Sequence, residues 1–358
     1  MLECVNFLAA RGHETHAIAE ALDAASISNL AICHQLPGQT IIPALHLPKF
    51  VRASARQHAA LSPQADIAAG FGVAAQPGSV VWMQSVHAAW IEIAQRLRGF
   101  CGRWKQRLNP FHPVILAMER RMLRERRYRQ LIALTPQVKD DLMRLYDVPA
   151  GDIAVLPNGY SRSEFNVEHR ARRREEMRAR LGFRDEHRVV VFVANEFERK
   201  GFFPLLRAVA ALGDPDVQLL AVGKLNPKAC RREIERLKMT GRVTFSGPTS
   251  DVADYYAAAD LFALPTQYEA WGLVIVEALA SGLPVLTSRL AGAAPVVREG
   301  ETGWLLDDPQ DDHEIAAKLD RLLRSPARPA VETSESVAPY AWDRLLLQYE
   351  AILAANAA

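Results

Sequence analysis

The sequence of 358 residues has few features that would bind a metal, cross a membrane or form a disulfide framework. Its four cysteines are scattered and form no Cys-x-x-Cys pair, which predicts free thiols in a reducing compartment. No apolar run approaches the ~20 residues that span a bilayer, and no signal-peptide pattern opens the chain. We therefore expect a cytoplasmic protein.

A large charge of either sign is also missing. Lysine and arginine number 43 against 41 aspartates and glutamates, a formal net charge of +2, so the chain as a whole lacks the basic character of a nucleic-acid-binding protein. An Asp-x-Asp pair at the end of a strand would suggest a divalent metal, but Asp214-Pro-Asp216 falls in a turn between elements. We predict no metal site, no cofactor and no nucleic-acid partner.

What the sequence does contain is a regular alternation of β-rich and helical patterns in its second half. Strands are predicted at Val189–Val193, Val217–Val222, Val243–Phe245, Asp260–Leu264, Val285–Thr287 and Gly303–Leu306. Helices are predicted around Pro204–Leu212, Pro227–Lys238, Val252–Ala258, Leu273–Ser281 and Ala293–Glu299. This alternation predicts an α/β fold with a parallel, doubly wound sheet, whose ligands bind beyond the carboxyl ends of the strands.

The first half has the same character with less regular spacing. Strands are predicted at Thr15–Ala19, Val80–Gln84, Leu131–Leu134 and Ile153–Leu156, and helices at Leu2–Arg11, Val114–Arg129 and Gln137–Tyr146. A polar, charged connector with a surface helix follows at residues 162–183, and an amphipathic helix is predicted at Ala341–Ala354. We expect two domains, residues 1–165 and 166–338, followed by a C-terminal helical segment, residues 339–358.

One segment of the second half has the pattern of an anion-binding site. Glu269 follows a predicted strand, seven mostly apolar residues separate it from Glu277, and Ala-Leu-Ala-Ser-Gly-Leu-Pro-Val comes next. Residues 272–274 stand at the start of the predicted helix, where unpaired N–H groups and the helix dipole favour a diphosphate. Glu277 is placed to accept hydrogen bonds from two vicinal hydroxyls. The alternative is an amphipathic core helix with two solvated glutamates.

The unbroken pattern from Glu269 to Val285 resembles the signature of the retaining, nucleotide-sugar-dependent glycosyltransferases of family 4. That resemblance implies the GT-B fold, in which two Rossmann-like domains face each other across a cleft and a C-terminal helix crosses back to the first domain. It also implies a hexosyltransferase that takes a UDP- or GDP-sugar as donor and a glycan or glycolipid as acceptor. Cationic side chains and a helix start would neutralise the leaving diphosphate without metal.

The resemblance also assigns roles to individual residues. The family's Gly-Arg-x-x-x-Lys-Gly loop matches residues 194–201, where Lys200 aligns with the lysine and Asn195 stands where the arginine usually is. Arg199 offers a replacement cation, and this departure resembles the lipopolysaccharide-core glucosyltransferase branch. His87, after the strand at residues 80–84, matches a histidine near the donor sugar, although a structural histidine is nearly as good an interpretation.

The resemblance implies that Glu269 binds hydroxyls of the donor sugar and that the leaving phosphate helps to deprotonate the acceptor. Phe245-Ser-Gly247 matches the segment that holds the base. The residues assigned to catalysis are His87, Lys200 and Glu269. Those assigned to donor binding are Asn195, Arg199, Lys200, Phe245, Gly247, Glu269, Gly272, Leu273, Val274 and Glu277.

The start of the chain departs from the family pattern. Family members open with a strand and a glycine-rich loop before a helix that ends in Arg-Gly-His-Glu-Val, and this chain reaches Arg11-Gly-His-Glu-Thr15 almost at once. The resemblance therefore implies that the opening strand and loop are missing, which leaves activity open. Two alternatives remain: a degenerate, non-catalytic sugar-nucleotide-binding protein, and a nucleotide-sugar 2-epimerase, whose family pattern lacks the Ala-Leu-Ala-Ser-Gly-Leu-Pro-Val helix.

Residues 95–130 carry a net charge of +9, with aromatic and aliphatic residues between the cations. Such a segment favours a helix on an anionic membrane surface, although an ordinary solvated face is an alternative. The predicted membrane patch contains Arg103, Lys105, Arg120, Arg121 and Arg124. We accordingly expect an enzyme of cell-envelope polysaccharide or lipopolysaccharide synthesis, bound peripherally at the inner face of the cytoplasmic membrane, with a lipid-linked or glycan acceptor.

Overall fold

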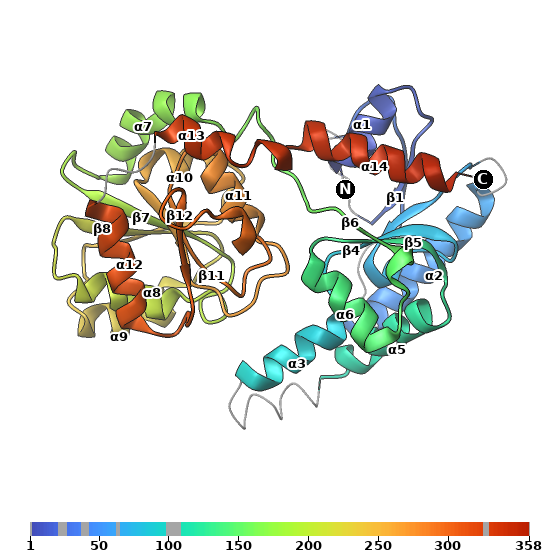
Figure 1. Ribbon diagram of the computed structural model, residues 1–358, viewed down its shortest axis with the longest axis horizontal. Coiled ribbons are helices and arrows are strands. Elements are labelled where there is room, and N and C mark those ends of the chain that lie inside the picture. Colours follow the sequence, from blue (N-terminus) through green and yellow to red (C-terminus); the bar gives the residue numbers. More distant parts are fainter. Residues whose placement is uncertain are drawn as a thin grey trace. The chain divides into compact units, whose positions relative to one another are not determined.

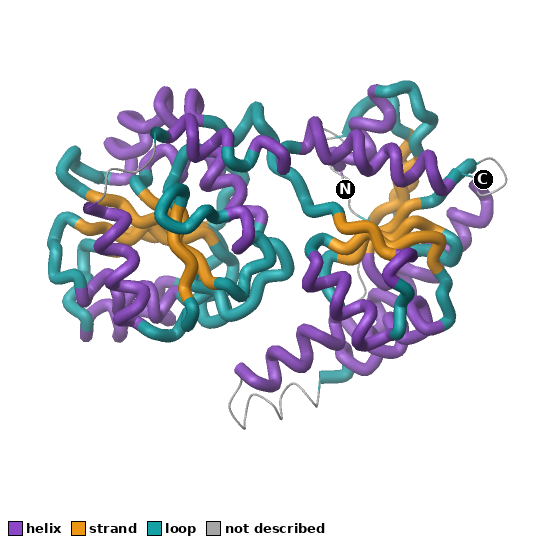
Figure 2. Tube along the Cα trace, in the orientation of Figure 1, coloured by secondary structure: helices purple, strands orange, loops and turns teal. Residues whose placement is uncertain are grey.

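The computed structural model of the protein describes residues 2–20, 27–36, 43–61, 65–97, 109–324 and 329–357. Contacts between Cα atoms divide the chain into a first unit, Met1–Pro157 with Trp342–Ala358, and a second unit, Asn158–Ala341. Each unit contains parallel strands with helices packed against them (Figures 1 and 2). The sequence-based boundaries at residues 165 and 338 lie slightly inside the second unit.

The sheet of the second unit has six parallel strands in the order β12-β11-β10-β7-β8-β9. The strands are β7 (Arg188–Val193), β8 (Val217–Val222), β9 (Val243–Gly247), β10 (Leu261–Leu264), β11 (Val285–Ser288) and β12 (Gly303–Leu306). From β7 the chain adds β8 and β9 on one side and then β10, β11 and β12 on the other. The order therefore reverses between β7 and β10, and ligands of open α/β sheets bind at such a switch point.

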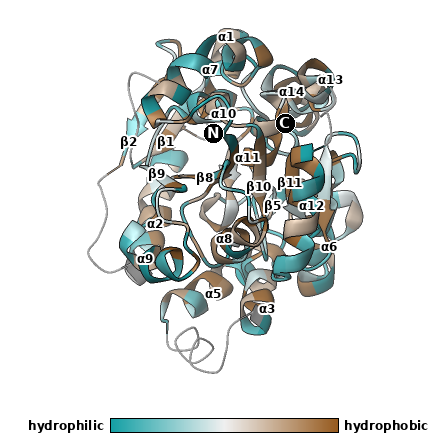
Figure 3. Cartoon of the chain, turned by 90° about the vertical axis from the view of Figure 1, so that its left-hand side faces the viewer, coloured by the Kyte–Doolittle hydropathy of each residue, from teal (hydrophilic) through white to brown (hydrophobic). Residues whose placement is uncertain are grey.

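Helices cover both faces of this sheet (Figure 1). They are α7 (Val167–Leu181), α8 (Phe202–Ala211), α9 (Pro227–Arg236), α10 (Val252–Ala258), α11 (Leu273–Ala280), α12 (Asp312–Arg324) and α13 (Ala330–Glu335). The helix α7 packs against α10 on one face, and α8 packs against α12 on the other. Figure 3 shows α11 and β10 as hydrophobic, whereas α9 is mostly hydrophilic. Apart from Glu277, every residue of α11 is apolar, which is typical of a helix in the interior.

The first unit contains a four-stranded parallel sheet, β3-β4-β5-β6, and a separate two-stranded parallel sheet, β1-β2. The strands are β1 (His16–Ala19), β2 (Ile32–Gln35), β3 (Ala69–Phe71), β4 (Ser79–Met83), β5 (Tyr128–Ala133) and β6 (Ile153–Val155). The helices are α1 (Leu2–Ala10), α2 (Pro43–Leu61), α3 (His87–Leu97), α5 (Phe111–Arg124), α6 (Pro136–Tyr146) and α14 (Trp342–Asn356). The helices α3, α5 and α6 contact one another on one side of the larger sheet, and α14 packs on α1 on the other (Figure 1).

The predicted α/β fold with parallel sheets is confirmed, but some elements of the first unit differ from the prediction. The helix predicted at Val114–Arg129 ends at Arg124, because Arg126 adopts a left-handed conformation (φ +48°) and Tyr128 begins β5. The prediction also missed α2, α3, β2 and β3. The strands β2 and β3 have only four and three residues, so the alternation of their side chains is too short to recognise.

In the second unit, the helix predicted at Ala293–Glu299 is only a short 3-10 turn, Ala294–Val296. Helical structure ends at Val297, whose ψ of 120° is extended, and the N–H of Arg298 donates instead to Oγ1 of Thr302 at 3.0 Å. The prediction missed α12, although its apolar residues recur at helical spacing. The six strands of this unit agree with the prediction to within one or two residues.

Gly201, at the end of the loop after β7, approaches the residue that follows β10. Its φ is +80°, and an added Cβ atom would lie 1.9 Å from the carbonyl oxygen of Pro265. We expect Gly201→Ala to lower the free energy of unfolding by more than about 2 kcal/mol, because left-handed strain of roughly 1–2 kcal/mol adds to a backbone clash. Urea denaturation measures the loss.

Gly213→Ala is the matched control for this substitution. Gly213 also has a positive φ, +67°, but no atom lies within 4 Å of the added Cβ. This variant should show the backbone strain without the clash. Equal losses of stability in the two variants would contradict the close approach of Gly201 to Pro265.

Candidate active site

Two loops at the switch point carry many of the residues predicted to bind the donor. One follows β7 and covers residues 194–201, and the other follows β10 and covers residues 265–272. Gln267 donates its backbone N–H to the carbonyl of Arg199 at 2.9 Å, and the Thr266 hydroxyl donates to the same carbonyl at 3.3 Å. The two loops are therefore joined by hydrogen bonds to one backbone oxygen.

Lys200 and Glu269 meet where these loops join. Nζ of Lys200 contacts Oε2 of Glu269, and the two side chains are only 14% and 20% exposed. Burial, followed by the neighbouring Arg199 guanidinium, lowers the pKa of Lys200 to about 8. The Glu196 carboxylate acts in the opposite direction, because a nearby negative charge favours the ammonium form. The pair places a cation and an anion side by side at the carboxyl ends of β7 and β10.

The Arg199 guanidinium is engaged within the same two loops. Its Nε and Nη2 atoms donate to the Glu196 carboxylate at 3.0 and 2.9 Å, and Nη1 donates to the Tyr268 carbonyl at 2.6 Å. Nη1 lies 4.0 Å from Oε2 of Glu269. Arg199 therefore stands beside the ion pair, as a fork that holds the loop after β10 in place.

The start of α11 lies directly after Glu269. Gly272 is its N-cap, with φ +97°, and no side chain accepts a hydrogen bond at this cap. Leu273 and Val274 form the first helical positions, whose N–H groups have no acceptor within a helix. The Glu269 backbone is fixed by a hydrogen bond from the N–H of Gly292 to its carbonyl at 2.8 Å. This helix start is electrostatically suited to an anion.

Glu277 lies one turn further along α11, in an apolar environment. The Tyr256 hydroxyl donates to its Oε2 atom at 3.3 Å and also to the Val274 carbonyl at 3.2 Å. Burial, followed by the negative charge of Glu164, raises the pKa of Glu277 to about 7. Its carboxyl group therefore exchanges a proton near neutral pH. Sequence reasoning missed Tyr256, which no motif distinguishes from a core aromatic residue.

The remaining donor residues lie on the side of β7 toward β8 and β9. Oδ1 of Asn195 accepts the N–H of Lys224 at 2.9 Å, which joins the loops after β7 and β8. The carbonyl of Gly247 accepts the N–H of Gly223 at 3.0 Å. The Phe245 ring packs near that of Phe202, with centroids 5.9 Å apart. The loops after three successive strands are thus linked to one another.

His87 is in the first unit, at the start of α3 after β4. Its Nε2 atom lies 3.1 Å from Nδ1 of His112, and its ring stacks on that of Trp90 at 5.7 Å. Burial, followed by the nearby His112, lowers the pKa of His87. A neutral imidazole is therefore favoured, and it can donate or accept a hydrogen bond according to its tautomer.

A buried glutamate that sequence reasoning missed holds His87 in place. Glu119, on α5, is 1% exposed and accepts the backbone N–H groups of His87 and Ala88 at 2.7 and 3.1 Å. The Tyr146 hydroxyl donates to the same carboxylate at 2.6 Å. Glu119 thus caps α3 from another helix. Glu119 is spaced from Ile115, Met122 and Leu123 so that all four lie on the buried side of α5. This helical spacing among apolar residues could have identified Glu119 as buried from the sequence.

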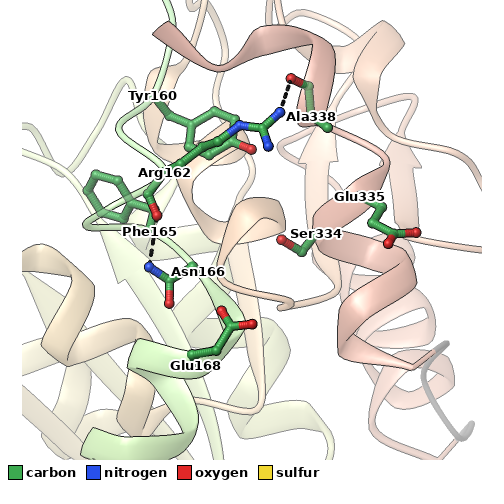
Figure 4. Close-up of a pocket in the computed structure, with 8 residues that line it drawn as sticks. All are labelled: Tyr160, Arg162, Phe165, Asn166, Glu168, Ser334, Glu335 and Ala338. Carbon is green, nitrogen blue, oxygen red and sulfur yellow. Dashed lines mark hydrogen bonds between the residues drawn. The ribbon is translucent and has the colours of Figure 1, made fainter. Parts of the chain in front are cut away.

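A cavity of about 360 Å³ lies elsewhere in the second unit (Figure 4). The residues that line it are Tyr160, Arg162, Phe165, Asn166, Glu168, Ser334, Glu335 and Ala338. None of the residues predicted to form the site belongs to this lining. The cavity lies beside the segments where the chain enters and leaves the second unit.

Comparison with known families accounts for both halves of the chain. Residues 1–164 match the family described as Glycosyltransferase Family 4, and residues 173–342 match the one described as Glycosyl transferases group 1. The chain belongs to the family 4 glycosyltransferases. The resemblance read from residues 269–285 is confirmed, and the matches support a hexosyltransferase.

Relatives of this glycosyltransferase include the lipopolysaccharide glucosyltransferase WaaG of Escherichia coli, 27% identical over 270 residues, which cover 74% of this chain and 70% of WaaG. A D-inositol 3-phosphate glycosyltransferase of Rhodococcus opacus is 34% identical over 219 residues, 58% of this chain and 48% of the relative. The chain thus matches about half the length of that relative.

Solved structures share the fold of this glycosyltransferase. The crystal structure of WaaG matches with a TM-score of 0.80 at 24% identity, covering 98% of this chain and 94% of WaaG. The structure of Anabaena Alr3699/HepE in complex with UDP-glucose matches with a TM-score of 0.70 at 19% identity, covering 99% and 95%. At these identities the match shows a common GT-B fold.

The environment of Lys200 predicts how its amine titrates. Competitive acetylation across a pH series, read by mass spectrometry, should give a midpoint near 8 for Lys200. Glu269→Gln should lower this midpoint, because it removes the anion that stabilises the ammonium form. Arg199→Ala should raise it, because it removes a neighbouring positive charge.

Lys224, which is exposed on the loop after β8, is the internal control within the same samples. Its extent of acetylation should be the same in the wild-type protein and in both variants. Shifts of Lys200 in the same direction for Glu269→Gln and Arg199→Ala would contradict the described arrangement of charges.

Proposed function

We propose that this glycosyltransferase moves a hexosyl group from a UDP- or GDP-sugar to a glycan or glycolipid acceptor, with retention of the anomeric configuration. One observation carries the proposal: Lys200 contacts Glu269 at the switch point, immediately before the uncapped start of α11. A cation and a helix start suit a diphosphate, and a neighbouring carboxylate suits sugar hydroxyls. The UDP-glucose complex of HepE supports a donor of this class.

In this proposal the donor lies along the linked loops of the second unit. The N–H groups at Gly272, Leu273 and Val274 bind the diphosphate together with Lys200, while Arg199 adds positive charge. Glu269 exchanges its contact with Lys200 for hydrogen bonds to hydroxyls of the sugar. The groups assigned to the nucleoside are Glu277 for the ribose hydroxyls, and Asn195, Phe245 and Gly247 for the base side of the site.

In the proposed transfer the acceptor attacks the anomeric carbon directly, and no protein side chain acts as a nucleophile. The bond between the anomeric carbon and the diphosphate oxygen breaks, and a bond from that carbon to the acceptor oxygen forms on the same face. The acceptor proton passes to the leaving diphosphate. Lys200 and the start of α11 neutralise the charge that develops there, which supports a metal-independent reaction. His87 is assigned to a donor-sugar hydroxyl or to the charge developing at the anomeric centre.

The likeness to WaaG favours lipopolysaccharide or another cell-envelope polysaccharide as the product. The relatives reported above are transferases, which argues against a nucleotide-sugar 2-epimerase. A non-catalytic sugar-nucleotide-binding protein is the second candidate, because Asn195 replaces the usual arginine of the family loop. Catalysed transfer of sugar from donor to acceptor separates this candidate from the enzyme.

Removing either the Lys200 or the Glu277 side chain from the donor site should weaken nucleotide binding. After a thermal-shift screen of UDP-, GDP- and ADP-sugars selects the nucleotide, calorimetry compares the wild-type protein with Lys200→Ala and Glu277→Ala. Each variant should bind at least about thirtyfold more weakly, because a charge-assisted hydrogen bond contributes roughly 2 kcal/mol or more. EDTA is present throughout and should leave the wild-type affinity unchanged.

Lys238→Asn is the matched control for this experiment, since it removes an exposed lysine between α9 and β9, at the opposite ends of the strands from the donor loops, and asparagine tolerates its left-handed φ of +55°. It should bind like the wild-type protein. Unchanged affinity in Lys200→Ala would refute the donor site. Loss of wild-type binding in EDTA with rescue by a divalent cation would refute metal independence.

We further propose that the exposed face of α5 binds an anionic membrane from the cytoplasmic side. Arg120, Arg121 and Arg124 are exposed on this helix, whereas Met122 and Leu123 are buried against the sheet. The structure thus corrects part of the expectation, because these apolar residues serve the core and the attraction would be electrostatic. Arg103 and Lys105 lie outside the described residues. Among the described helices, none has the length and apolarity needed to cross a bilayer.

Replacing Arg120, Arg121 and Arg124 together by glutamine tests the membrane proposal. Binding to vesicles with 30% anionic lipid should weaken by about a hundredfold, because each basic residue near such a surface contributes roughly 1 kcal/mol. Co-sedimentation at low salt measures the change.

The control replaces three exposed arginines of α9, Arg231, Arg232 and Arg236, by glutamine. This change removes the same amount of positive charge from the second unit. This variant should retain most of the vesicle binding. Equal effects of the two triple variants would mean that net charge, rather than the face of α5, determines binding.

A further inference from the structure

Trp271 lies in the middle of the loop that carries Glu269, yet it faces the places where the chain crosses between units. Trp271 is 6% exposed, and its indole N–H donates to the carbonyl of Asn158 at 3.0 Å. Its ring packs on that of Tyr340, with centroids 5.6 Å apart. Asn158 is the first residue of the second unit, and Tyr340 is next to its last residue, Ala341. We call residues 158–162 and 338–341, where the chain passes between the two units, the crossing segments. The Trp271 side chain therefore contacts both of them.

The two crossing segments are also bonded to each other. The N–H of Tyr160 donates to the carbonyl of Tyr340 at 3.1 Å, and Tyr160 forms a parallel β-bridge with Ala341. Arg162 donates to the Ala338 carbonyl at 3.0 Å, as Figure 4 shows. A displacement of one segment is therefore passed to the other through backbone hydrogen bonds.

On its other side, Trp271 is part of the rigid donor loop. Its carbonyl accepts the N–H of Ala293 at 2.7 Å, and the Glu269 carbonyl accepts the N–H of Gly292 at 2.8 Å. Gly272 follows with a left-handed φ of +97°. These bonds join Glu269 and Trp271 to residues 292–293 as one unit, so a shift of Glu269 displaces the indole ring as well.

We propose that Trp271 is a positioning residue that transmits occupancy of the donor site to the two crossing segments. This inference rests on the proposed donor site. When Glu269 exchanges Lys200 for the donor, the loop shift reaches Asn158 through the indole N–H and Tyr340 through the ring. A ligand shifts a conformational equilibrium only through contacts that differ between states, and Trp271 supplies such a contact. The cavity beside the crossing segments leaves room for the displacement.

Hydrogen exchange with and without donor tests the proposal. The probe is UDP-glucose, with GDP-mannose as the second probe. In the wild-type protein, donor should slow exchange in peptides of the crossing segments by about tenfold, because it stabilises the hydrogen bond from Tyr160 to Tyr340. Trp271→Phe keeps a ring and loses the N–H donor. It should bind the probe within about threefold of wild type and show clearly less donor-induced protection of these peptides, because only the ring contact with Tyr340 remains.

Two further variants make the result specific. Trp304→Phe alters a tryptophan of β12 whose ring lies 4.7 Å from the Arg321 guanidinium, and it should behave like the wild type. Tyr340→Leu removes the ring contact from the crossing side and leaves the donor loop intact. It should also reduce the donor-induced protection, because it removes the second of the two contacts, and it does so even if Trp271→Phe folds poorly.

The outcomes separate this inference from the proposed function. Full donor-induced protection in Trp271→Phe and Tyr340→Leu would overturn the coupling while leaving the donor site in place. Loss of probe binding in Trp271→Phe together with normal protection at saturating probe would also overturn it, because Trp271 would then act within the site alone. A wild-type protein that binds neither probe would overturn the donor site, and the inference with it.

Discussion

The contact between Lys200 and Glu269 is the interaction on which the proposed chemistry depends. Removing two charges from water is costly, and each is tolerated at this depth because the other lies beside it. A diphosphate brings its own negative charge to Lys200, so its arrival need not leave the ammonium unpaired. Glu269 is then released toward hydroxyls that can donate to it. The ligand-free pair therefore keeps both groups in the charge state that the donor requires.

The first unit also contains a buried carboxylate, Glu119, which is stabilised by neutral hydrogen-bond donors instead of a cation. Glu119 has no cationic partner among its described contacts and is stabilised by two backbone N–H groups and the Tyr146 hydroxyl. Burial raises its pKa, whereas these hydrogen bonds lower it. The two backbone bonds hold the first residues of α3, His87 and Ala88, and the Tyr146 bond holds the carboxylate in place. Replacing this carboxylate would disturb the imidazole without touching it.

The sequence predicted the second unit well because each of its strands is a buried apolar run bounded by turn residues. The run from Val189 to Val193 and the run from Val217 to Val222 are such cases. It predicted that Lys200 and Glu269 follow strands, but it did not predict that they touch. That contact requires β7 and β10 to be neighbours, although two other strands separate them along the chain. The local pattern of apolar and polar residues does not reveal the order of the strands in the sheet.

Other features escaped prediction for different physical reasons. Glu119 belongs to a segment whose eleven cations obscure a single acidic residue on the apolar face of a helix. The indole N–H of Trp271 finds its partner in Asn158, more than a hundred residues earlier, so no spacing rule reveals it. The left-handed residue that ends α5 is Arg126 rather than a glycine or asparagine, the residues that usually indicate such a conformation. Tertiary packing decided each of these.

The geometry at the switch point is set from the opposite end of the sheet. β7 and β10 pair over only two residue pairs, Leu261 with Val190 and Phe262 with Val191. Asp260 extends this short pairing, because its carboxylate accepts the N–H of Val189 at 2.7 Å. The arginines of α7 then hold Asp260 and the end of α10: Arg174 binds the carboxylate at 2.5 Å and the Ala259 carbonyl at 2.9 Å.

This arrangement explains why a surface helix with many arginines matters for a distant site. Arg178, 5% exposed, donates to the Ala258 carbonyl at 3.1 Å, and Arg170 donates to the Ala259 carbonyl at 3.0 Å. Cations at the C-terminal carbonyls of α10 are favoured by its dipole. Because α10 leads directly into β10, fixing its end fixes the register of β10 against β7. The distance between Lys200 and Glu269 at the other end of these strands follows from that register.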